Sequence, residues 1–335
     1  MSPAPKISVV MSAYNAAAYL DDSIGSILGQ SFRDFEFIII NNGSTDDTRS
    51  VLERYRKLDR RVRVYYHKQE GLAAALTYGC RLSRGQYIAL QDADDISFPG
   101  RLQRQFDYIE RRPGIGILGT WICKTDVNGT LIGNWCPSSN PKTLKWAYFF
   151  GMCVPCPSSM MRRDILEKLD FFRPDLLHAE DVDLWLRASS ITEFGCVPHP
   201  LYKYRVWAGS KTQSHLQLVR DAHVRLLRGF IKEFLKVDPA VEAVVGLRQT
   251  RVGPAFKSFR QIRMTAVLIQ DLYRKFVKEN VLTPCERREI SQDAAKRIAS
   301  LALQASRFNT PGSMKLGIRA LKLDYRLLYP SAIKK

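Results

Sequence analysis

The sequence has no apolar run long enough to cross a bilayer. A spanning helix needs about 20 apolar residues, and the nearest candidate, residues 146–157, is short and interrupted by glycine and proline. The N-terminus also lacks the charged segment and apolar core of a secretory signal, because residues 1–6 lead directly into a strand-like run. We therefore expect the protein in the cytoplasm, or held peripherally on the inner face of the membrane.

Cysteine is scarce and gives no sign of a disulfide framework. The seven cysteines are an odd number, scattered from Cys80 to Cys285, which favours reduced thiols. Cys153 and Cys156 form one C-x-x-C, but no second C-x-x-C and no H-x-x-x-H follows at the spacing of a zinc site. We expect small buried thiols, with a metal or redox role as the alternative.

Acidic residues are rare in the last third of the chain. The 335 residues carry a formal net charge of +18, and residues 1–210 hold 26 basic and 23 acidic side chains, whereas residues 211–335 hold 25 and 10. Such an excess is compatible with nucleic acid, an anionic membrane or a phosphorylated substrate as partner. Most of the excess charge lies in the C-terminal region, and charge alone does not choose among these three partners.

The first half of the chain alternates apolar runs of strand length with amphipathic segments, which predicts a mostly parallel sheet flanked by helices. A composition of 45% hydrophobic and 25% charged residues excludes a disordered or fibrous chain. The expected strands are residues 7–12, 35–40, 62–66 and 86–91, and the expected helices are residues 16–29, 46–58, 71–83 and 101–112.

Beyond Gly114 the regular alternation stops. Short apolar pieces between proline and glycine predict an irregular, partly antiparallel region. These pieces are residues 115–122, 131–135, 158–161 and 201–206. From about residue 214 the apolar spacing becomes helical, and the expected helices are residues 215–236, 256–280, 285–306 and 313–328.

One acidic cluster follows the last strand of the first half. Asp92, Asp94 and Asp95 come directly after an apolar run, and ligands in open α/β sheets bind at the carboxyl ends of strands. Clustered carboxylates suit Mg²⁺ or Mn²⁺, which prefer hard oxygen ligands. A solvated acidic turn, or Asp95 capping the next helix, is the alternative.

Two further polar segments are less specific when taken alone. Residues 40–46 run from a strand end through a glycine turn toward a helix, where backbone N–H groups can meet a nucleotide, although a plain turn has the same pattern. Residues 178–187 place Glu180 and Asp181 at the start of a helix. These two acids suit a general base, or they merely complement the helix dipole.

In this order and with these intervals, the three segments resemble the family 2 glycosyltransferases, which have the GT-A fold. The resemblance covers about residues 5–210. The segments that carry it are residues 8–15, 26–32, 43–46, 71–75, 84–88, 92–95, 99–102, 158–163, 180–181, 184–187 and 204–205.

The resemblance implies an α/β fold with a GT-A Rossmann-like mixed sheet flanked by helices, followed by a helical C-terminal extension. Residues 1–210 would be the catalytic domain, with a nucleotide-sugar half (about 1–112) and an acceptor half (about 113–210). Residues 211–335 would be a basic helical region.

The implied activity is an inverting, divalent-metal-dependent transfer of a sugar. The donor would be a nucleotide sugar and the acceptor a hydroxyl of a glycan or lipid-linked molecule, in the synthesis of surface polysaccharide or lipopolysaccharide. The alternative is a non-catalytic nucleotide-sugar or glycan-binding protein on a degenerate GT-A scaffold.

The resemblance also implies roles for individual residues. The implied nucleotide-sugar ligands are Ser12, Tyr14, Asn42, Ser44 and Asp92. Asp94, together with Asp92, would hold the Mg²⁺ or Mn²⁺ that bridges the diphosphate. Asp181 would remove the proton of the acceptor hydroxyl, with Glu180 beside it.

Two positions depart from the family pattern. Asn41 and Asn42 stand where two aspartates are usual, so an amide oxygen would accept from the base without the assistance of a charge. Trp207 stands where a histidine often joins the metal. It could stack on a sugar, seal the site or belong to the core.

The last predicted helix, residues 313–328, carries an apolar stripe beside a basic one. The apolar stripe is Met314, Ile318, Leu321, Tyr325 and Leu328, and the basic stripe is Lys315, Arg319, Lys322 and Arg326. This helix could lie on an anionic membrane, with each cation contributing about 1 kcal/mol, or pack on the catalytic domain. We do not expect nucleic acid, because no aromatic platform or recognised module accompanies the cations.

Overall fold

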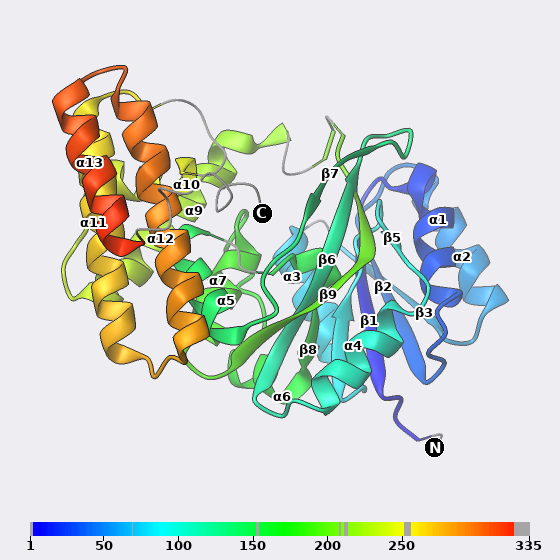
Figure 1. Cartoon of the computed structure of the whole chain (residues 1–335). Helices are drawn as coiled ribbons and strands as arrows, with labels where there is room; N and C mark the ends of the chain where they lie inside the picture. Colours follow the sequence, from blue (N-terminus) through cyan, green and yellow to red (C-terminus); the bar gives the residue numbers. More distant parts are fainter. Residues whose placement is uncertain are drawn as a thin grey trace. The chain divides into compact units, whose positions relative to one another are not determined.

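The chain folds into two compact units. The computed structural model describes residues 3–68, 70–151, 154–207, 209–210, 214–250 and 256–324. The first unit is Met1–Lys145 with Met152–Val219, and the second is Trp146–Gly151 with Arg220–Lys335 (Figure 1). Among the described helices, none combines the length and the apolarity that a bilayer crossing requires.

Four parallel strands form one half of the sheet in the first unit. β1 (Ile7–Ala13) lies between β2 (Phe35–Asn42) and β4 (Tyr87–Leu90), and β3 (Val62–His67) pairs with β2. Apolar residues fill these strands, and β1, β2 and β4 are almost wholly buried, as expected for parallel strands covered on both faces. The four strands predicted in the first half are confirmed.

The other half of the sheet is mixed, as the broken pattern after Gly114 predicts. β8 is antiparallel to both β4 and β6, β9 is parallel to β6, and β5 and β7 add antiparallel edges to β9 and β6. These strands are β5 (Ile96–Ser97), β6 (Ile115–Thr125), β7 (Leu131–Trp135), β8 (Met160–Arg162) and β9 (Glu193–Arg205).

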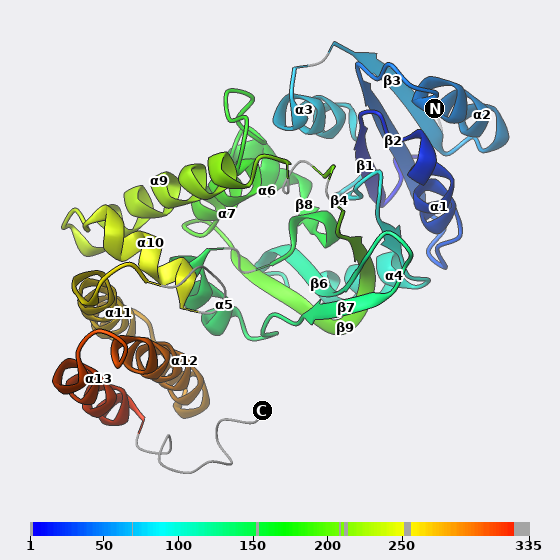
Figure 2. The ribbon, with the colours of Figure 1, turned by 90° about the horizontal axis from the view of Figure 1, so that it is seen from above.

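Helices cover both faces of the parallel half (Figure 2). Val9 and Met11 join the core under α1, α2 and α4, whereas Val10 points toward α3, because side chains alternate along a strand. A β-carbon on Gly79 of α3 would lie 2.6 Å from Val10 Cγ1, so glycine allows this close approach. The helices are α1 (Ala17–Leu28), α2 (Thr48–Leu58), α3 (Leu72–Leu82) and α4 (Arg101–Glu110).

Short helices lie between the remaining strands. α5 (Pro141–Ala147) ends just past the boundary of the first unit at Lys145, and η1 (Tyr148–Phe150) belongs to the second. The others lie in the first unit and are η2 (Cys156–Ser158), α6 (Arg163–Lys168) and α7 (Glu180–Ala188). The mixed α/β sheet with flanking helices agrees with the fold class that the sequence predicts.

The second unit is helical and has a core of its own. Trp146 and Phe149, which lie far earlier in the chain than the other members, are part of it. The indole N–H of Trp146 donates to Asp293 at 2.8 Å, and its ring packs edge-on against Phe276. The helices are α9 (Leu216–Leu235), α10 (Val241–Gln249), α11 (Phe259–Glu279), α12 (Pro284–Ala305) and α13 (Thr310–Leu323).

The last helix is shorter than predicted. α13 ends at Leu323, and Asp324 has an extended backbone with φ of −151°, so the expectation of a continuous helix over residues 313–328 is wrong. The helix makes its last i→i−4 hydrogen bond from the Asp324 N–H to the carbonyl of Ala320 and ends there because the backbone of Asp324 is extended. Tyr325, Arg326 and Leu328 lie outside the described residues.

The buried face of α13 also differs from the predicted apolar stripe. Leu316 and Ala320 enter the core of the second unit, while Met314 and Ile318 are 66% and 54% exposed. The helix carries two apolar stripes, and packing against α12 buries only one of them. Of the described members of the predicted stripe, Met314 and Ile318 are on the solvent side and Leu321 is half-buried.

Candidate active site

The carboxyl ends of three adjacent parallel strands bring several predicted site residues to one edge of the sheet. Ser12 lies near the end of β1, Asn42 ends β2, and Asp92 follows β4, with β1 between the other two strands. Tyr14 follows β1 and is 47% exposed. The strand order therefore groups residues that are up to 80 positions apart in the sequence.

The turns after β1 and β2 are locked together by hydrogen bonds. The Asn15 side chain accepts from the backbone N–H of Thr45 at 2.8 Å, and the Asn15 N–H donates to Ser44 Oγ at 3.1 Å. Asn15 has a φ of 46°, a left-handed value that asparagine tolerates better than most residues. Ser44, a predicted nucleotide-sugar ligand, is thus held by the neighbouring turn.

The two asparagines that replace the usual aspartates are buried and bonded within the chain. Asn41 Oδ1 accepts from the backbone N–H of Ser44 at 3.0 Å. The amide of Asn42 donates to the carbonyl of Gly71 at 3.2 Å, while its oxygen accepts from the N–H of Glu70 at 3.4 Å. Because an aspartate has no N–H to donate, the bond to Gly71 is a specific consequence of asparagine at this position.

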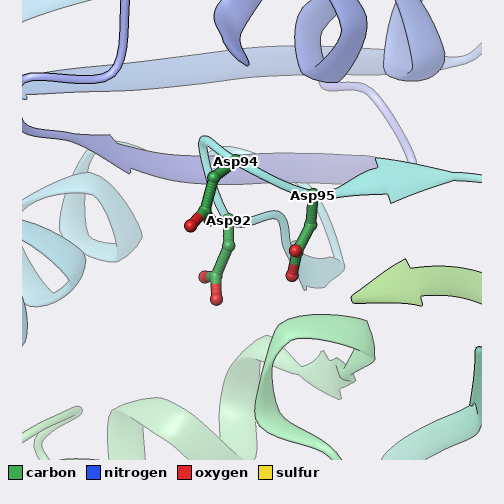
Figure 3. A group of neighbouring side chains, drawn as sticks. All are labelled: Asp92, Asp94 and Asp95. Atoms are coloured by element: carbon green, nitrogen blue, oxygen red, sulfur yellow. The ribbon is translucent and has the colours of Figure 1, made fainter. Parts of the chain in front are cut away.

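The acidic loop after β4 gathers three carboxylates. One oxygen from each of Asp92, Asp94 and Asp95 lies within 4.8 Å of the others. All three side chains point to the same side of the loop, away from the helix above it and toward the segments drawn in green (Figure 3). The three carboxylates therefore face one common point.

Asp95 is the most deeply buried of the three, at 1% exposed. Burial, and then the charges of Asp92 and Asp94, raise its pKa well above the usual range. Asp95 Oδ1 accepts from the backbone N–H of Arg205 at 2.8 Å, while Oδ2 is buried without a well-formed hydrogen bond within the described residues. A divalent cation would offset this repulsion, so the residues present fit Mg²⁺ or Mn²⁺.

The structure excludes the two alternatives for this loop, which were a solvated acidic turn and a helix cap at Asp95. A carboxylate as buried as Asp95 does not belong to a solvated turn. Nor does Asp95 cap the next helix, because α4 begins at Arg101 with Gly100 as its N-cap.

A buried arginine is hydrogen-bonded to residues on both sides of the acidic loop. Arg101 is fully buried, and its guanidinium donates to Gln91 Oε1, Ser97 Oγ and the carbonyls of Leu90 and Ser159. Burial lowers its pKa to about 10, against the attraction of Asp92 and Asp95, so it remains a cation at neutral pH. The sequence offered no role for this arginine beyond its place in a matched segment.

Trp207 also contacts the acidic loop. Its indole N–H donates to Asp94 Oδ2 at 2.8 Å, and its ring centroid lies 5.4 Å from that of Tyr19. The sequence left open stacking on a sugar, sealing of the site or a place in the core, and the indole is half-buried at the acidic loop rather than part of a buried core.

The first turn of α7 holds three acids in different environments. Asp183 has a structural role, because its carboxylate accepts hydrogen bonds from Arg187 at 2.8 Å and from Arg173 at 3.2 Å. Glu180 is 8% exposed, and Asp181 is half-buried and accepts from the N–H of Val182 at 2.8 Å. The pair singled out from the sequence is therefore distinct from the structural acid that follows it.

The pKa of Cys156 depends on acids from both the acidic loop and α7. Burial raises the pKa of the Cys156 thiol well above its usual value, and the charges of Asp181, Asp92 and Glu180 raise it further. Acids from both the acidic loop and the first turn of α7 therefore contribute to the electrostatic environment of this thiol. A thiol held neutral in this way is a poor metal ligand or nucleophile.

The described cysteines are free thiols, as expected: Cys80, Cys123, Cys136, Cys156, Cys196 and Cys285. Only Cys80 and Cys196 are buried, whereas Cys136 and Cys285 are exposed, so the expectation that these thiols are buried is wrong for most of them. Cys153, the first member of the C-x-x-C, lies outside the described residues.

A family model and a curated protein that match this chain both describe glycosyltransferases. The family model described as glycosyl transferase family 2 matches residues 8–170. The O-antigen biosynthesis glycosyltransferase WbnJ of Escherichia coli is 35% identical over 234 residues, covering 69% of this chain and 89% of WbnJ.

Two solved structures share the fold at low sequence identity. Residues 1–349 of S. aureus TarS, in complex with UDP-GlcNAc, give a TM-score of 0.57 at 17% identity, covering 96% of this chain and 92% of that one. The mannosyltransferase PcManGT of Pyrobaculum calidifontis, in complex with GDP-Man and Mn²⁺, gives 0.53 at 15% identity, covering 100% and 89%.

Proposed function

The chain belongs to glycosyl transferase family 2, and we propose that it is an inverting, metal-dependent enzyme that uses a nucleotide-sugar donor. The observation that carries the proposal is the cluster of Asp92, Asp94 and Asp95 after β4, whose carboxylate oxygens lie within 4.8 Å of one another. Such a cluster can hold a cation against a charged donor, and the half-buried Asp181 at the start of α7 is the candidate base. We assign this chemistry to residues 1–210.

The acceptor is a hydroxyl of a glycan or lipid-linked molecule in the synthesis of surface polysaccharide or lipopolysaccharide. The similarity to an O-antigen biosynthesis glycosyltransferase supports this class of acceptor. The donors held by the two structural neighbours, UDP-GlcNAc and GDP-Man, support a nucleoside diphosphate as the leaving group.

The carboxylates divide the work in this mechanism. Asp181 takes the proton of the acceptor hydroxyl, whose oxygen forms a bond to the anomeric carbon while the bond from that carbon to the diphosphate oxygen breaks. Glu180 lies beside this base in the same helical turn. Attack from the side opposite the leaving group inverts the anomeric centre.

The ends of β1 and β2 hold the nucleotide. Ser12, Tyr14, Asn42 and Ser44 line this part of the site, and Asp92 faces the ribose. Asp92 and Asp94 would hold Mg²⁺ or Mn²⁺, which neutralises charge on the diphosphate when bound.

A donor screen tests the proposed function. Purified protein is incubated with Mn²⁺ and a panel of UDP-, GDP- and dTDP-sugars, with and without a membrane extract that contains acceptors, and released nucleoside diphosphate is measured. We expect release from donors of one base class and its loss on chelation with EDTA. Donor binding by calorimetry without any release would instead support a non-catalytic protein on this scaffold.

The solvent face of α13 is suited to an anionic membrane, and we propose that it docks the enzyme near lipid-linked acceptors. Met314 and Ile318 are exposed on this face, Lys315 and Lys322 are exposed beside them, and α13 contains no acidic residue. Apolar side chains between cations are what an interfacial helix presents to lipid.

Vesicle binding tests this face. Each lysine near an anionic surface contributes about 1 kcal/mol, so the double variant Lys315→Gln/Lys322→Gln is expected to bind phosphatidylglycerol-containing vesicles about 30-fold more weakly in sedimentation assays. The matched control is Lys232→Gln/Lys236→Gln on and after α9, where both lysines already pair with acids. Equal binding by the two double variants would contradict the assignment to α13.

A further inference from the structure

The hydrogen bond from Trp207 to Asp94 has no role in the proposed mechanism. The indole N–H of Trp207 donates to Asp94 Oδ2 at 2.8 Å, across 113 positions of the sequence. The indole has a single N–H, so this bond takes its whole donor capacity. A carboxylate has two oxygens, and the bond leaves Oδ1 of Asp94 for another partner.

The indole ring is held firmly in this position. It packs against Tyr19 of α1, and the guanidinium of Arg205 lies 4.6 Å from the centre of the same tyrosine ring. Arg205 also pairs with Asp22 of α1 at 3.5 Å. A β-carbon on Gly209 would lie only 2.2 Å from Trp207 Cζ3, so the backbone there is in direct contact with the indole.

The end of β9 thus reaches two acids of the loop at once. The backbone N–H of Arg205 donates to Asp95, and the side chain of Trp207 donates to Asp94. Both donors are neutral, so they orient carboxylates without cancelling the negative charge that a cation needs. Hydrogen bonds of this kind to ligating carboxylates typically raise metal affinity 10–100-fold.

We propose that Trp207 is a positioning residue, which orients Asp94 for a divalent cation by donating its indole N–H to Oδ2. The inference rests on the proposed function, since it assumes that Asp94 binds the metal. It gives the tryptophan at this position a defined role in place of a metal-ligating side chain.

The test measures Mn²⁺ binding directly. Free Mn²⁺ is followed by electron paramagnetic resonance in the presence of UDP or of GDP, for wild type, Trp207→Phe and Trp121→Phe. Phenylalanine keeps an aromatic ring and removes the N–H. The control Trp121→Phe also removes one indole hydrogen bond, to the carbonyl of Pro137 at 2.9 Å, but this tryptophan lies on β6 and makes no contact with the acidic loop that the structure records.

We expect Trp207→Phe to bind Mn²⁺ about 10-fold more weakly than wild type, with Trp121→Phe unchanged and the melting temperature of Trp207→Phe close to that of wild type. In an Asp94→Asn background, Trp207→Phe should cause little further loss, because its effect passes through Asp94. This second comparison separates positioning from a general loosening of the loop, which would weaken binding in both backgrounds.

Unchanged Mn²⁺ affinity in Trp207→Phe would overturn the inference while leaving the proposed function intact. Tighter binding would also overturn it, because the indole would then be a competitor of the ion. If wild type binds no Mn²⁺ with either diphosphate, the metal dependence itself fails, which is a different result from either of these.

Discussion

Replacing Asp181 by asparagine is expected to slow sugar transfer by about 10³-fold, since a general base contributes roughly 10²–10⁴-fold. Asparagine has nearly the shape of aspartate and cannot take the proton. Its oxygen can still accept from the N–H of Val182, as Asp181 does at 2.8 Å, so the fold should be kept. Single-turnover rates with saturating donor, together with melting temperatures, measure the two quantities separately.

The neighbouring acids supply matched controls for Asp181. Asp183→Asn breaks a buried ion pair with Arg187, whose side chain is 19% exposed against 5% for Asp183. Such a loss typically costs about 3 kcal/mol of stability, but the rate per folded molecule should stay near that of wild type. Glu180→Gln shows whether the base is one residue or the pair. Near-normal turnover in Asp181→Asn would remove Asp181 as the base.

Replacing Asp94 by asparagine is expected to lower transfer by about 10³-fold, and the residual rate should no longer respond to Mn²⁺. The cation is worth several kcal/mol of transition-state stabilisation when bound, and an amide oxygen is a weaker ligand than a carboxylate. Transfer rates across a Mn²⁺ titration, with and without EDTA, give both numbers.

Asp164→Asn is a suitable control for this experiment. Asp164 is an exposed carboxylate of α6 that pairs with Lys168 one helical turn later, and such surface pairs contribute little. It should retain the rate and the Mn²⁺ response of wild type. An Asp94→Asn enzyme that keeps an undiminished response to Mn²⁺ would place the metal elsewhere.

Most of the α/β framework could be predicted because its signals are local. The apolar run at residues 35–40 and the helical spacing at residues 46–58 are properties of short segments, and they became β2 and α2 within a few residues. The acidic loop was found for the same reason, since a strand end followed by three acids is a contiguous pattern. Asp181 and Glu180 stand next to each other in the sequence, so this pair is also a contiguous pattern.

The features that the sequence left open depend on partners far along the chain. From the sequence, Asn42 is expected to bind a base without the assistance of the charge that an aspartate has. In the structure, its amide donates to the carbonyl of Gly71, 29 positions away. Arg101 is fully buried and donates to Gln91 and Ser97, on either side of the acidic loop. Neither partner can be identified from the residue types alone.

The apolar stripes of α13 illustrate the same limit for packing. Both the stripe containing Leu316 and the stripe containing Met314 have helical spacing, and contact with α12 decides which is buried. Burial depends on what the neighbouring helix presents, and periodicity carries no information about that neighbour.

The sequence by itself determined the order of the four parallel strands and the helices that flank them, the family pattern and the identity of the acids, because these follow from local periodicity and from contiguous motifs. The tertiary structure alone decided how those acids are held. The bond from Trp207 to Asp94 and the bond from Arg205 to Asp95 both join segments that the sequence keeps apart. The physical reason is that hydrogen bonds and burial depend on distance in space, and only the folded sheet brings these segments within reach.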